Sequence, residues 1–365
     1  MSRVSGLSAI LAAMLLASQA HAGLVFGRFL YPGNELERIN RKLCGRIVDH
    51  TFNHGKDNRI CSSALSEKRD VYVYLPPNYN PNLQYPLIIY MHGFSQDEHA
   101  FFELAPIFED AVRRGVCPPA IVAAPDGSLR GKPSLLNAGS FFVNSKAGRF
   151  EDFVMQDLWN FMHQCYPVRP EREAHTLIGG SMGGFSAFNL GIKYREVVRN
   201  VAGILPPLNL RYVDCYGRYF TNFDPDCLGW REKLHPFAPI ARYYGVLPVR
   251  QRRLVDPLFG RSPNAISRIA AENPVEMLES YDVRPGQLEM FIAYGGRDEF
   301  NIDAQVESFV HFAKCRGISP TVSYDPCGRH TVAHGKLHFP GLTVWLGERL
   351  KDYSPSAPRV LIEQR

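Results

Sequence analysis

The chain has 365 residues, of which 45% are hydrophobic and 21% are charged, and its formal net charge is +5. This length suffices for one large single-core domain or for a domain with a sizeable insertion. The charge balance is too mild to indicate nucleic-acid binding, and no basic stripe interleaved with aromatic residues follows the chain.

The N-terminus has the pattern of an export signal. Arg3 precedes an apolar run from Leu7 to Ala17, and Ala20-His21-Ala22 supplies a small-x-small cleavage pattern. The run is too short for an ordinary transmembrane helix, although an uncleaved anchor is the alternative interpretation. We therefore predict a signal peptide at residues 1–22, a secreted or periplasmic protein, and no stable membrane span after cleavage. Residues 23–44 are then an N-terminal extension.

Eight cysteines follow the predicted cleavage site, and an even number in an exported chain permits disulfides. No pair has the C-x-x-C spacing that is typical of a metal site. The pairs closest in sequence are Cys215 with Cys227 and Cys44 with Cys61, so we expect these two as small clips.

Short apolar runs alternate with helical patterns from residue 45 onward, which favours an α/β fold over separate α and β parts. Apolar runs without polar alternation, such as residues 87–93, fit strands that are buried on both faces. The predicted strands are 45–52, 69–75, 87–93, 120–124, 176–178, 200–205, 288–294 and 321–324. The predicted helices are 102–114, 151–164, 184–194, 303–315 and 337–350. We therefore expect a mostly parallel central sheet flanked by helices.

One long segment interrupts this alternation. Residues 206–281 are rich in proline, arginine and aromatic residues and contain two cysteines. We interpret them as a cap insertion within a main domain of residues 45–350, followed by a C-terminal tail at 351–365.

The segment Gly179–Gly183 (GGSMG) matches G-x-S-x-G, the nucleophile elbow. In this motif a serine sits on a tight strand-to-helix turn, and the flanking glycines prevent side-chain collisions. The segment follows a predicted strand and precedes a predicted helix, so Ser181 is the candidate nucleophile. A glycine-rich turn with an inactive serine is the alternative.

A serine nucleophile needs a base, and the base needs an acid that orients it. In the fold that carries this elbow the chain order is serine, acid, histidine. Asp298 lies directly after a later predicted strand, with Glu299 and Asp303 as alternatives. His330 lies in the loop after the last predicted strand and is the candidate base.

Three other histidines follow the candidate acid. His311 lies within a predicted helix, where packing is the expected role. His334 and His338 are four residues apart and could share a helix face as metal ligands, but no H-E-x-x-H pattern accompanies them. We expect neither a metal nor a cofactor.

The tetrahedral intermediate of acyl transfer needs two backbone N–H donors. We assign them to Met182, which follows the nucleophile, and to Phe94, with Gly93 as the alternative to Phe94. His92 is expected to support this loop rather than to act as a base.

The sequence resembles the putative-esterase family, which includes esterase D, feruloyl and acetylxylan esterases, enterochelin esterases and mycolyltransferases. The resemblance covers about residues 68–350 and implies an α/β-hydrolase fold. It places the nucleophile on Ser181, the acid on Asp298, the base on His330 and the oxyanion donors on Phe94 and Met182. The motifs that carry it are RDVYVYLPPNY (69–79), YPLIIYMHG (85–93), APDG (124–127), SFF (140–142) with NS (144–145), GGSMGG (179–184) and GGRDE (295–299).

The sequence departs from the family pattern at two places. Gly328-Arg329-His330 stands where members often have Gly-Gly-His, which puts a large cation beside the site. The cap is also longer than in a simple family member. Its arginines and tyrosines predict a pocket border that favours anionic or carbohydrate substrates, and a solvated insertion is the alternative.

The expected activity is hydrolysis of a carboxylic ester, through an acyl-enzyme, on a small-molecule or carbohydrate ester outside the cytoplasm. An acyltransferase with the same triad is the second hypothesis, and a non-catalytic carbohydrate-binding protein on a hydrolase scaffold is the third. The sequence predicts no oligomeric state.

Overall fold

The structure is a computed structural model that describes residues 35–131, 139–243 and 247–357. The predicted signal peptide at 1–22 lies outside the described residues, as do residues 23–34 of the predicted extension. Within the three described ranges, every helix falls short of the length and apolarity needed to span a bilayer.

An eight-stranded sheet forms the centre of the molecule, in the order β1-β4-β6-β5-β9-β10-β15-β16. β4 is antiparallel to both β1 and β6, and the other neighbouring strands are parallel. The prediction of a mostly parallel sheet is therefore confirmed. The strands are β1 (Arg46–His50), β4 (Val71–Leu75), β6 (Ile121–Pro125), β5 (Leu87–Met91), β9 (His175–Gly180), β10 (Asn200–Ile204), β15 (Glu289–Gly295) and β16 (Thr321–Asp325).

The central strands are buried on both faces, because alternate side chains of an extended strand point to opposite sides. All five residues of β4 are buried. Tyr72 and Tyr74 belong to the hydrophobic cluster on one face, whereas Val71 and Val73 belong to the cluster on the other. The alternation of tyrosine and valine in this strand thus reflects two apolar faces rather than a solvent-facing side.

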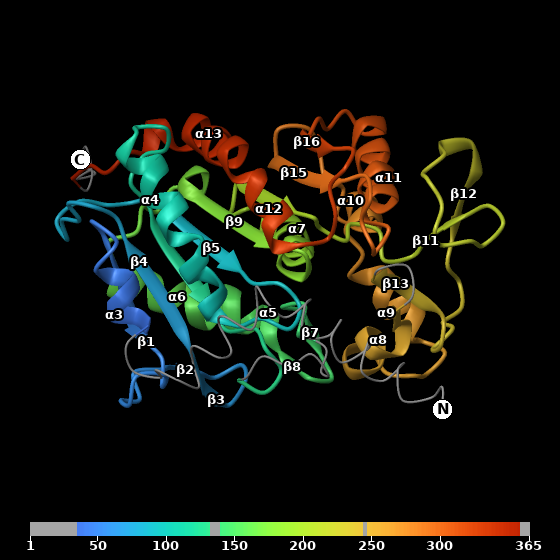
Figure 1. Ribbon diagram of the computed structural model, residues 1–365, viewed down its shortest axis with the longest axis horizontal. Helices are drawn as coiled ribbons and strands as arrows, with labels where there is room; N and C mark the ends of the chain where they lie inside the picture. Colours follow the sequence, from blue (N-terminus) through green and yellow to red (C-terminus); the bar gives the residue numbers. More distant parts are fainter. Residues whose placement is uncertain (1–34, 132–138, 244–246, 358–365) are drawn as a thin grey trace, which may run out of the picture.

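Helices cover both faces of the sheet (Figure 1). The first layer contains α4 (Ala105–Arg113) and α13 (Phe339–Leu350), which share a hydrophobic cluster. The opposite layer contains α6 (Trp159–Cys165), α7 (Met182–Lys193) and α11 (Ile302–Cys315). The helix predicted at 151–164 is observed as α5 (Phe150–Asp152), a π-helical stretch (Phe153–Leu158) and α6. A short helix, α12 (Val332–Leu337), precedes α13.

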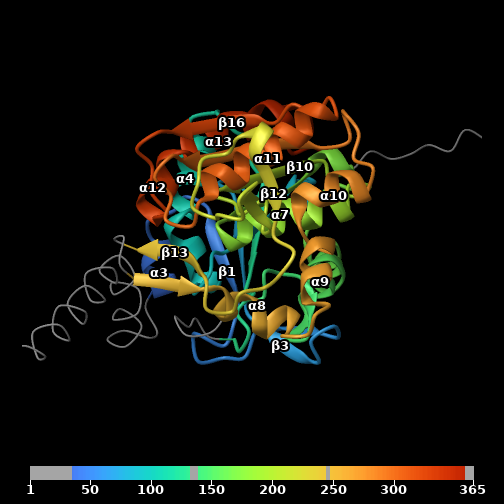
Figure 2. The same ribbon diagram turned by 90° about the vertical axis from the view of Figure 1, so that its right-hand side faces the viewer.

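The predicted cap lies between the neighbouring parallel strands β10 and β15, and on the right of Figure 1. Its last helix, α10 (Pro274–Ser280), packs against α7 and α11 and belongs to the helical layer. We use the name cap below for residues 206–271. The cap contains β11 (Tyr212–Asp214), β12 (Leu228–Trp230), β13 (Pro239–Tyr243), β14 (Leu247–Arg250), α8 (Gln251–Phe259) and α9 (Ala265–Ala271). Of these elements, β12, β13, α8 and α9 lie toward the viewer in Figure 2.

The first residues of the predicted C-terminal tail are held against the domain. The Arg169 guanidinium donates to Ser356 Oγ at 2.8 Å, and the Gln84 backbone N–H donates to the Ser356 carbonyl at 2.8 Å. Residues 358–365 lie outside the described part.

Candidate active site

Ser181 occupies the tight turn between β9 and α7. Its backbone has φ 51° and ψ −116°, a conformation that L-residues rarely adopt and that marks a strained position. A Cβ on Gly179 would lie 2.1 Å from the carbonyl carbon of Gly183, and a Cβ on Gly183 would lie 2.0 Å from the Met91 oxygen. The two glycines of the motif are therefore needed for the turn to form.

Ser181, His330 and Asp298 come from three loops at one edge of the sheet. Each follows the carboxyl end of a strand, namely β9, β16 and β15, and in parallel strands these ends lie at the same edge. Ser181 Oγ lies 2.8 Å from His330 Nε2. His330 Nδ1 lies 2.7 Å from Asp298 Oδ2, and the Asp298 side chain is fully buried. The three residues proposed from the sequence are thus in hydrogen-bonding contact in the predicted order.

The surroundings of His330 set its protonation. Asp298 Oδ2 is an acceptor, so the ring proton lies on Nδ1 and leaves the Nε2 lone pair facing the Ser181 hydroxyl. Burial alone would lower the pKa of His330, but the Asp298 carboxylate, with a smaller contribution from Glu299, raises it above the ordinary value of 6.5. The Phe300 ring packs against the imidazole, with ring centroids 4.6 Å apart.

Glu299, an alternative acid in the sequence, contacts the backbone of His330 rather than its ring. Its Oε2 accepts the His330 backbone N–H at 2.8 Å, and its Oε1 accepts from Arg329 Nε at 2.8 Å. Arg329 is therefore ion-paired with Glu299, and it does not line the pocket described below. Sequence reasoning missed this positioning role of Glu299, for which the only signal was its place beside Asp298.

Asp303, the other alternative acid, lies in the first turn of α11. Burial, with a further contribution from Asp298, raises its pKa to about 6. No hydrogen bond joins its carboxylate to His330 among the described residues.

His334 and His338 are both buried and contact each other. Their Nε2 atoms lie 3.2 Å apart, and His338 Nδ1 lies 2.8 Å from Ser323 Oγ. His311 lies in α11 and contacts the rings of Phe223 and Phe312.

A different group, which the sequence analysis missed, has metal-ligand geometry within the described ranges. Single ligand atoms of Asp97, Glu98 and His99 lie within 4.8 Å of one another, and all three residues are buried. His99 Nδ1 lies 3.1 Å from Glu98 Oε1 and 3.3 Å from Asp97 Oδ1. Burial opposes protonation of His99, but the two carboxylates raise its pKa to about 10. An ion pair between His99 and its acidic neighbours accounts for this cluster.

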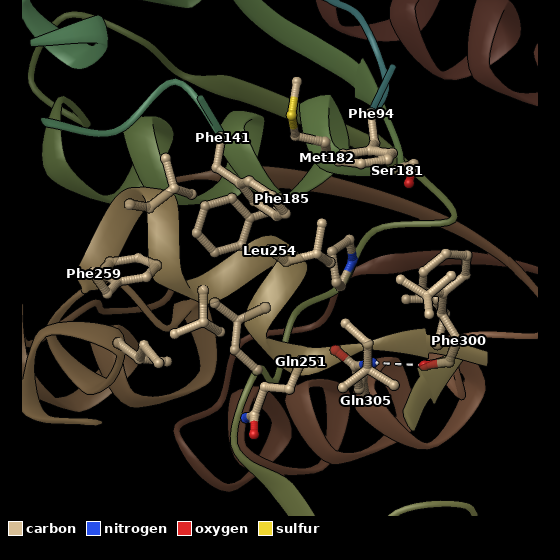
Figure 3. Close-up of a pocket in the computed structure, with 18 of the residues that line it drawn as sticks. Phe94, Phe141, Ser181, Met182, Phe185, Gln251, Leu254, Phe259, Phe300 and Gln305 are labelled. Carbon is tan, nitrogen blue, oxygen red and sulfur yellow. Dashed lines mark hydrogen bonds between the residues drawn. The ribbon is translucent and has the colours of Figure 1, made fainter. Parts of the chain in front are cut away.

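The candidate oxyanion donors flank the nucleophile. Phe94 and Met182 lie beside Ser181 in Figure 3. The Gly93 N–H donates to Gln96 Oε1 at 2.8 Å, whereas the N–H groups of Phe94 and Met182 have no acceptor among the described residues. Gly93, the alternative donor, is thus already engaged.

His92 supports the loop that carries Phe94. The Gly127 backbone N–H donates to His92 Nε2 at 2.8 Å, so the ring proton lies on Nδ1, which donates to the Gly93 carbonyl at 2.9 Å. This buried contact ties the ends of β5 and β6 together and agrees with the supporting role expected for His92.

A predominantly apolar pocket opens beside Ser181 and His330 (Figure 3). One wall comes from the main domain and includes Phe94, Met182 and Phe185. The other wall comes from the cap. The apolar lining residues of the cap are Pro207, Leu210, Leu234, Ile240, Val249, Leu254, Val255, Leu258, Phe259, Ile266 and Ile269. The cap therefore borders the candidate site.

The cap borders the pocket mainly with apolar side chains, and most of its arginines do not line it. In α8, Leu254 and Leu258 face the pocket, whereas Arg252 and Arg253 are exposed on the other side of the helix. This division follows from the helical period, which places residues four apart on one face. Arg231 is the cation of the cluster that lines the described pocket.

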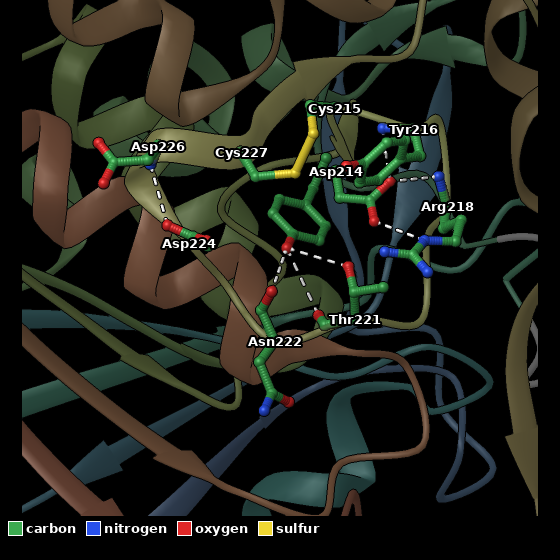
Figure 4. Close-up of a disulfide and its surroundings, with 10 residues drawn as sticks. Asp214, Cys215, Tyr216, Arg218, Thr221, Asn222, Asp224, Asp226 and Cys227 are labelled. Atoms are coloured by element: carbon green, nitrogen blue, oxygen red, sulfur yellow. Dashed lines mark hydrogen bonds and ion pairs between the residues drawn. A yellow bond between two sulfur atoms is a disulfide. The ribbon is translucent and has the colours of Figure 1, made fainter.

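The predicted disulfide between Cys215 and Cys227 is present and clips the cap loop that follows β11 (Figure 4). The predicted pair of Cys44 with Cys61 is wrong, because both side chains are free. Cys44 precedes β1 at the end that pairs with Leu75, whereas Cys61 pairs with Lys68, before the opposite end of β4. The length of an extended strand therefore separates the two sulfurs.

Comparison with known protein families matches residues 62–325 to the family described as "Putative esterase". Among curated proteins, "Esterase Rv1288" from Mycobacterium tuberculosis (strain ATCC 25618 / H37Rv) is 25% identical over 240 residues, which is 65% of this chain and 46% of that protein. "Uncharacterized protein YjcH" from Bacillus subtilis (strain 168) is 25% identical over 150 residues, which is 40% of this chain and 59% of that protein. The chain thus spans less than two thirds of these relatives' own length.

Solved structures share the fold at low sequence identity. A ferulic acid esterase superposes with a TM-score of 0.60 at 17% identity, covering 84% of this chain and 99% of that one. The ferulic acid esterase AmCE1/Fae1A from Anaeromyces mucronatus, solved in complex with ferulic acid, gives a TM-score of 0.53 at 15% identity and covers 83% of this chain and 90% of that one. The predicted α/β-hydrolase fold is confirmed.

Proposed function

Because the chain belongs to the putative esterase family, we propose that it hydrolyses carboxylic esters, with Ser181 as the nucleophile. His330 is the general base and then the general acid, and Asp298 holds the imidazole and stabilises its charged form. The observation that carries this proposal is the pair of contacts at 2.8 Å and 2.7 Å that link Ser181 to His330 and His330 to Asp298.

In the first half of the reaction, Ser181 Oγ attacks the ester carbonyl carbon while His330 Nε2 takes the hydroxyl proton. The carbonyl oxygen becomes negatively charged and accepts from the N–H groups of Phe94 and Met182. The bond to the alcohol oxygen then breaks, and His330 returns the proton to that oxygen. The products of this half are the free alcohol and an acyl group on Ser181.

In the second half, a water molecule takes the place of the alcohol. His330 accepts a proton from the water, the resulting hydroxide attacks the acyl carbon, and Ser181 leaves with the proton that His330 returns. The carboxylic acid is released and the enzyme returns to its starting state.

The lining of the pocket favours an apolar acyl part. Aromatic and branched aliphatic side chains from both walls surround the space next to Met182 and Phe185. The solved ferulic acid esterase that binds ferulic acid supports an aromatic acyl group. The alcohol part of the ester is a small molecule or a carbohydrate.

We place this activity outside the cytoplasm. The predicted signal peptide at residues 1–22 and the disulfide between Cys215 and Cys227 both support a secreted or periplasmic protein, because disulfides persist in oxidising compartments.

The test is hydrolysis of 4-nitrophenyl acetate, 4-nitrophenyl butyrate and methyl ferulate by the full chain, with product identity read by mass spectrometry. Wild-type protein is expected to release the free acid, and Ser181→Ala is expected to lower kcat at least about 10³-fold, because the nucleophile is lost. Ser63→Ala is the matched control, since its exposed hydroxyl contacts Asp157 and not the pocket. Undiminished turnover by Ser181→Ala would contradict the proposal, as would transfer of the acyl group to an added sugar with no free acid formed.

A further inference from the structure

The described pocket has a polar end that the hydrolytic mechanism does not use. The polar residues that line this end are Tyr219, Arg231 and Gln305. The Arg231 guanidinium lies over the Tyr219 ring, with its central carbon 4.9 Å from the ring centroid. Gln305 Nε2 donates to Tyr219 Oη at 2.9 Å, so Arg231 and Gln305 both contact this tyrosine.

Arg231 lines the pocket and is only partly exposed, yet it has no acidic partner among the described residues. Arg218 pairs with Asp214 at 2.6 Å, and Arg211 pairs with Glu276 at 2.5 Å. The side chain of Arg231, by contrast, makes no hydrogen bond or ion pair with any residue in the described ranges. Its surroundings withdraw it from water, and this burial lowers its pKa.

A partly buried guanidinium without a counter-ion is unfavourable, since it stays charged and has up to five N–H donors to satisfy. The protein provides no hydrogen-bond acceptor for the Arg231 guanidinium among the described residues, but a bound ligand can supply one. Gln305 provides a second unsatisfied group. This residue is 3% exposed, and its Oε1 has no hydrogen-bond partner.

The contacts of Tyr219 place this polar end on the His330 side of the site. Tyr219 Oη donates to the Phe300 carbonyl at 2.6 Å, and the Phe300 ring packs on the His330 imidazole. His330 delivers its proton to the departing alcohol oxygen, so the alcohol part of an ester lies toward this side. The apolar wall at Met182 and Phe185 then remains for the acyl part.

We propose that Arg231 binds a carboxylate on the alcohol part of the substrate, so that the protein prefers esters whose leaving alcohol is anionic. A carboxylate matches the planar, two-pronged guanidinium, and a hydroxyl beside it can donate to Gln305 Oε1. This inference rests on the proposed esterase function and names Arg231 as a residue that determines specificity.

The test compares two esters that differ in one charge. In 4-(butyryloxy)benzoate the leaving phenol carries a carboxylate, and in 4-(butyryloxy)benzamide it carries a neutral group of the same shape. The measured quantity is the ratio of kcat/KM for the charged ester to kcat/KM for the neutral one. Arg231→Met is expected to lower this ratio about tenfold to a hundredfold, the usual effect of a lost charge-assisted hydrogen bond. Arg231→Lys is expected to retain part of the preference.

Arg252→Met is the matched control, because Arg252 lies on the exposed side of α8, stacked on Phe237, and does not line the pocket. It is expected to keep the wild-type ratio. An unchanged ratio in folded Arg231→Met, with both esters still hydrolysed, would overturn the role of Arg231 and leave the esterase function intact. Failure of wild-type protein to hydrolyse either ester would overturn the esterase function itself.

Discussion

Two neighbouring carboxylates act on different atoms of His330. Asp298 accepts from the ring Nδ1 and Glu299 accepts from the backbone N–H, so one orients the imidazole and the other fixes the loop that carries it. The Asp298 carboxylate also stabilises the protonated ring, which raises the pKa of His330. In the proposed mechanism His330 must be neutral before it can accept the serine proton.

This raised pKa predicts the acid side of the pH profile. Because the protonated form is favoured, kcat/KM is expected to fall as the pH drops, with a midpoint above the ordinary histidine value of 6.5. Asp298→Asn removes the main charge that raises the pKa, so the midpoint is expected to move down while kcat falls roughly 10⁴-fold. Steady-state rates on 4-nitrophenyl butyrate between pH 5 and pH 9 measure both effects. A wild-type midpoint at or below 6.5 would contradict this account.

The residues predicted from the sequence were those whose position relative to a predicted strand indicates their place in the fold. Ser181, Asp298 and His330 each follow a strand, and the order of strands in a parallel sheet brings such loops together. The roles of Glu299 and Arg231 depend on where a side chain points after folding. The sequence shows Glu299 only as a neighbour of Asp298, and it does not distinguish Arg231 from the exposed arginines of the cap.

Among the elements, the cap loop between Cys215 and Cys227 contributes to the polar end of the pocket. It carries Tyr219, and β12 directly after it leads to Arg231. The Tyr212 hydroxyl, from β11, donates to the Asn222 carbonyl of this loop at 2.9 Å. A covalent clip across this loop reduces the conformations open to Tyr219.

Removing the clip is therefore expected to loosen one wall of the pocket. A closed loop of this length contributes about 3 kcal/mol in the chain-entropy description. In the double variant Cys215→Ser/Cys227→Ser, we expect faster hydrogen–deuterium exchange in residues 215–231 and a higher KM for 4-nitrophenyl butyrate. Peptides from β9 and α7 are expected to exchange as in the wild type. The control is Cys44→Ser/Cys61→Ser, in which both altered thiols are free and exposed. Equal exchange in the two variants would show that the clip does not order the loop.

Strands and helices of the main domain could be predicted because the pattern of apolar residues in each reflects which of its faces are buried. Features that depend on contacts between distant segments could not be predicted in this way. α10 was predicted as part of the cap, yet Val275 and Leu278 bury it against α7 and α11. The pairing of Cys44 with Cys61 rested on closeness in sequence, whereas the extended strands of the sheet separate the two residues in space.

At the scale of the whole molecule, the sheet brings the ends of its parallel strands to one edge and the cap covers that edge. The loops after β5, β9, β15 and β16 supply Phe94, Ser181, Asp298 and His330. The cap adds the apolar wall and Arg231. The main domain thus supplies the groups proposed for chemistry, and the cap supplies the groups proposed for selection of the substrate.

The central claim is that His330 and Asp298 make the hydroxyl of Ser181 reactive. A fluorophosphonate probe, which attaches covalently to an activated serine, measures this directly by intact mass and by fragmentation of the labelled peptide. The account predicts one label per wild-type chain, located on Ser181, and none on folded Ser181→Ala. A folded wild-type protein that takes no label, or a Ser181→Ala variant that takes as much as the wild type, would contradict it.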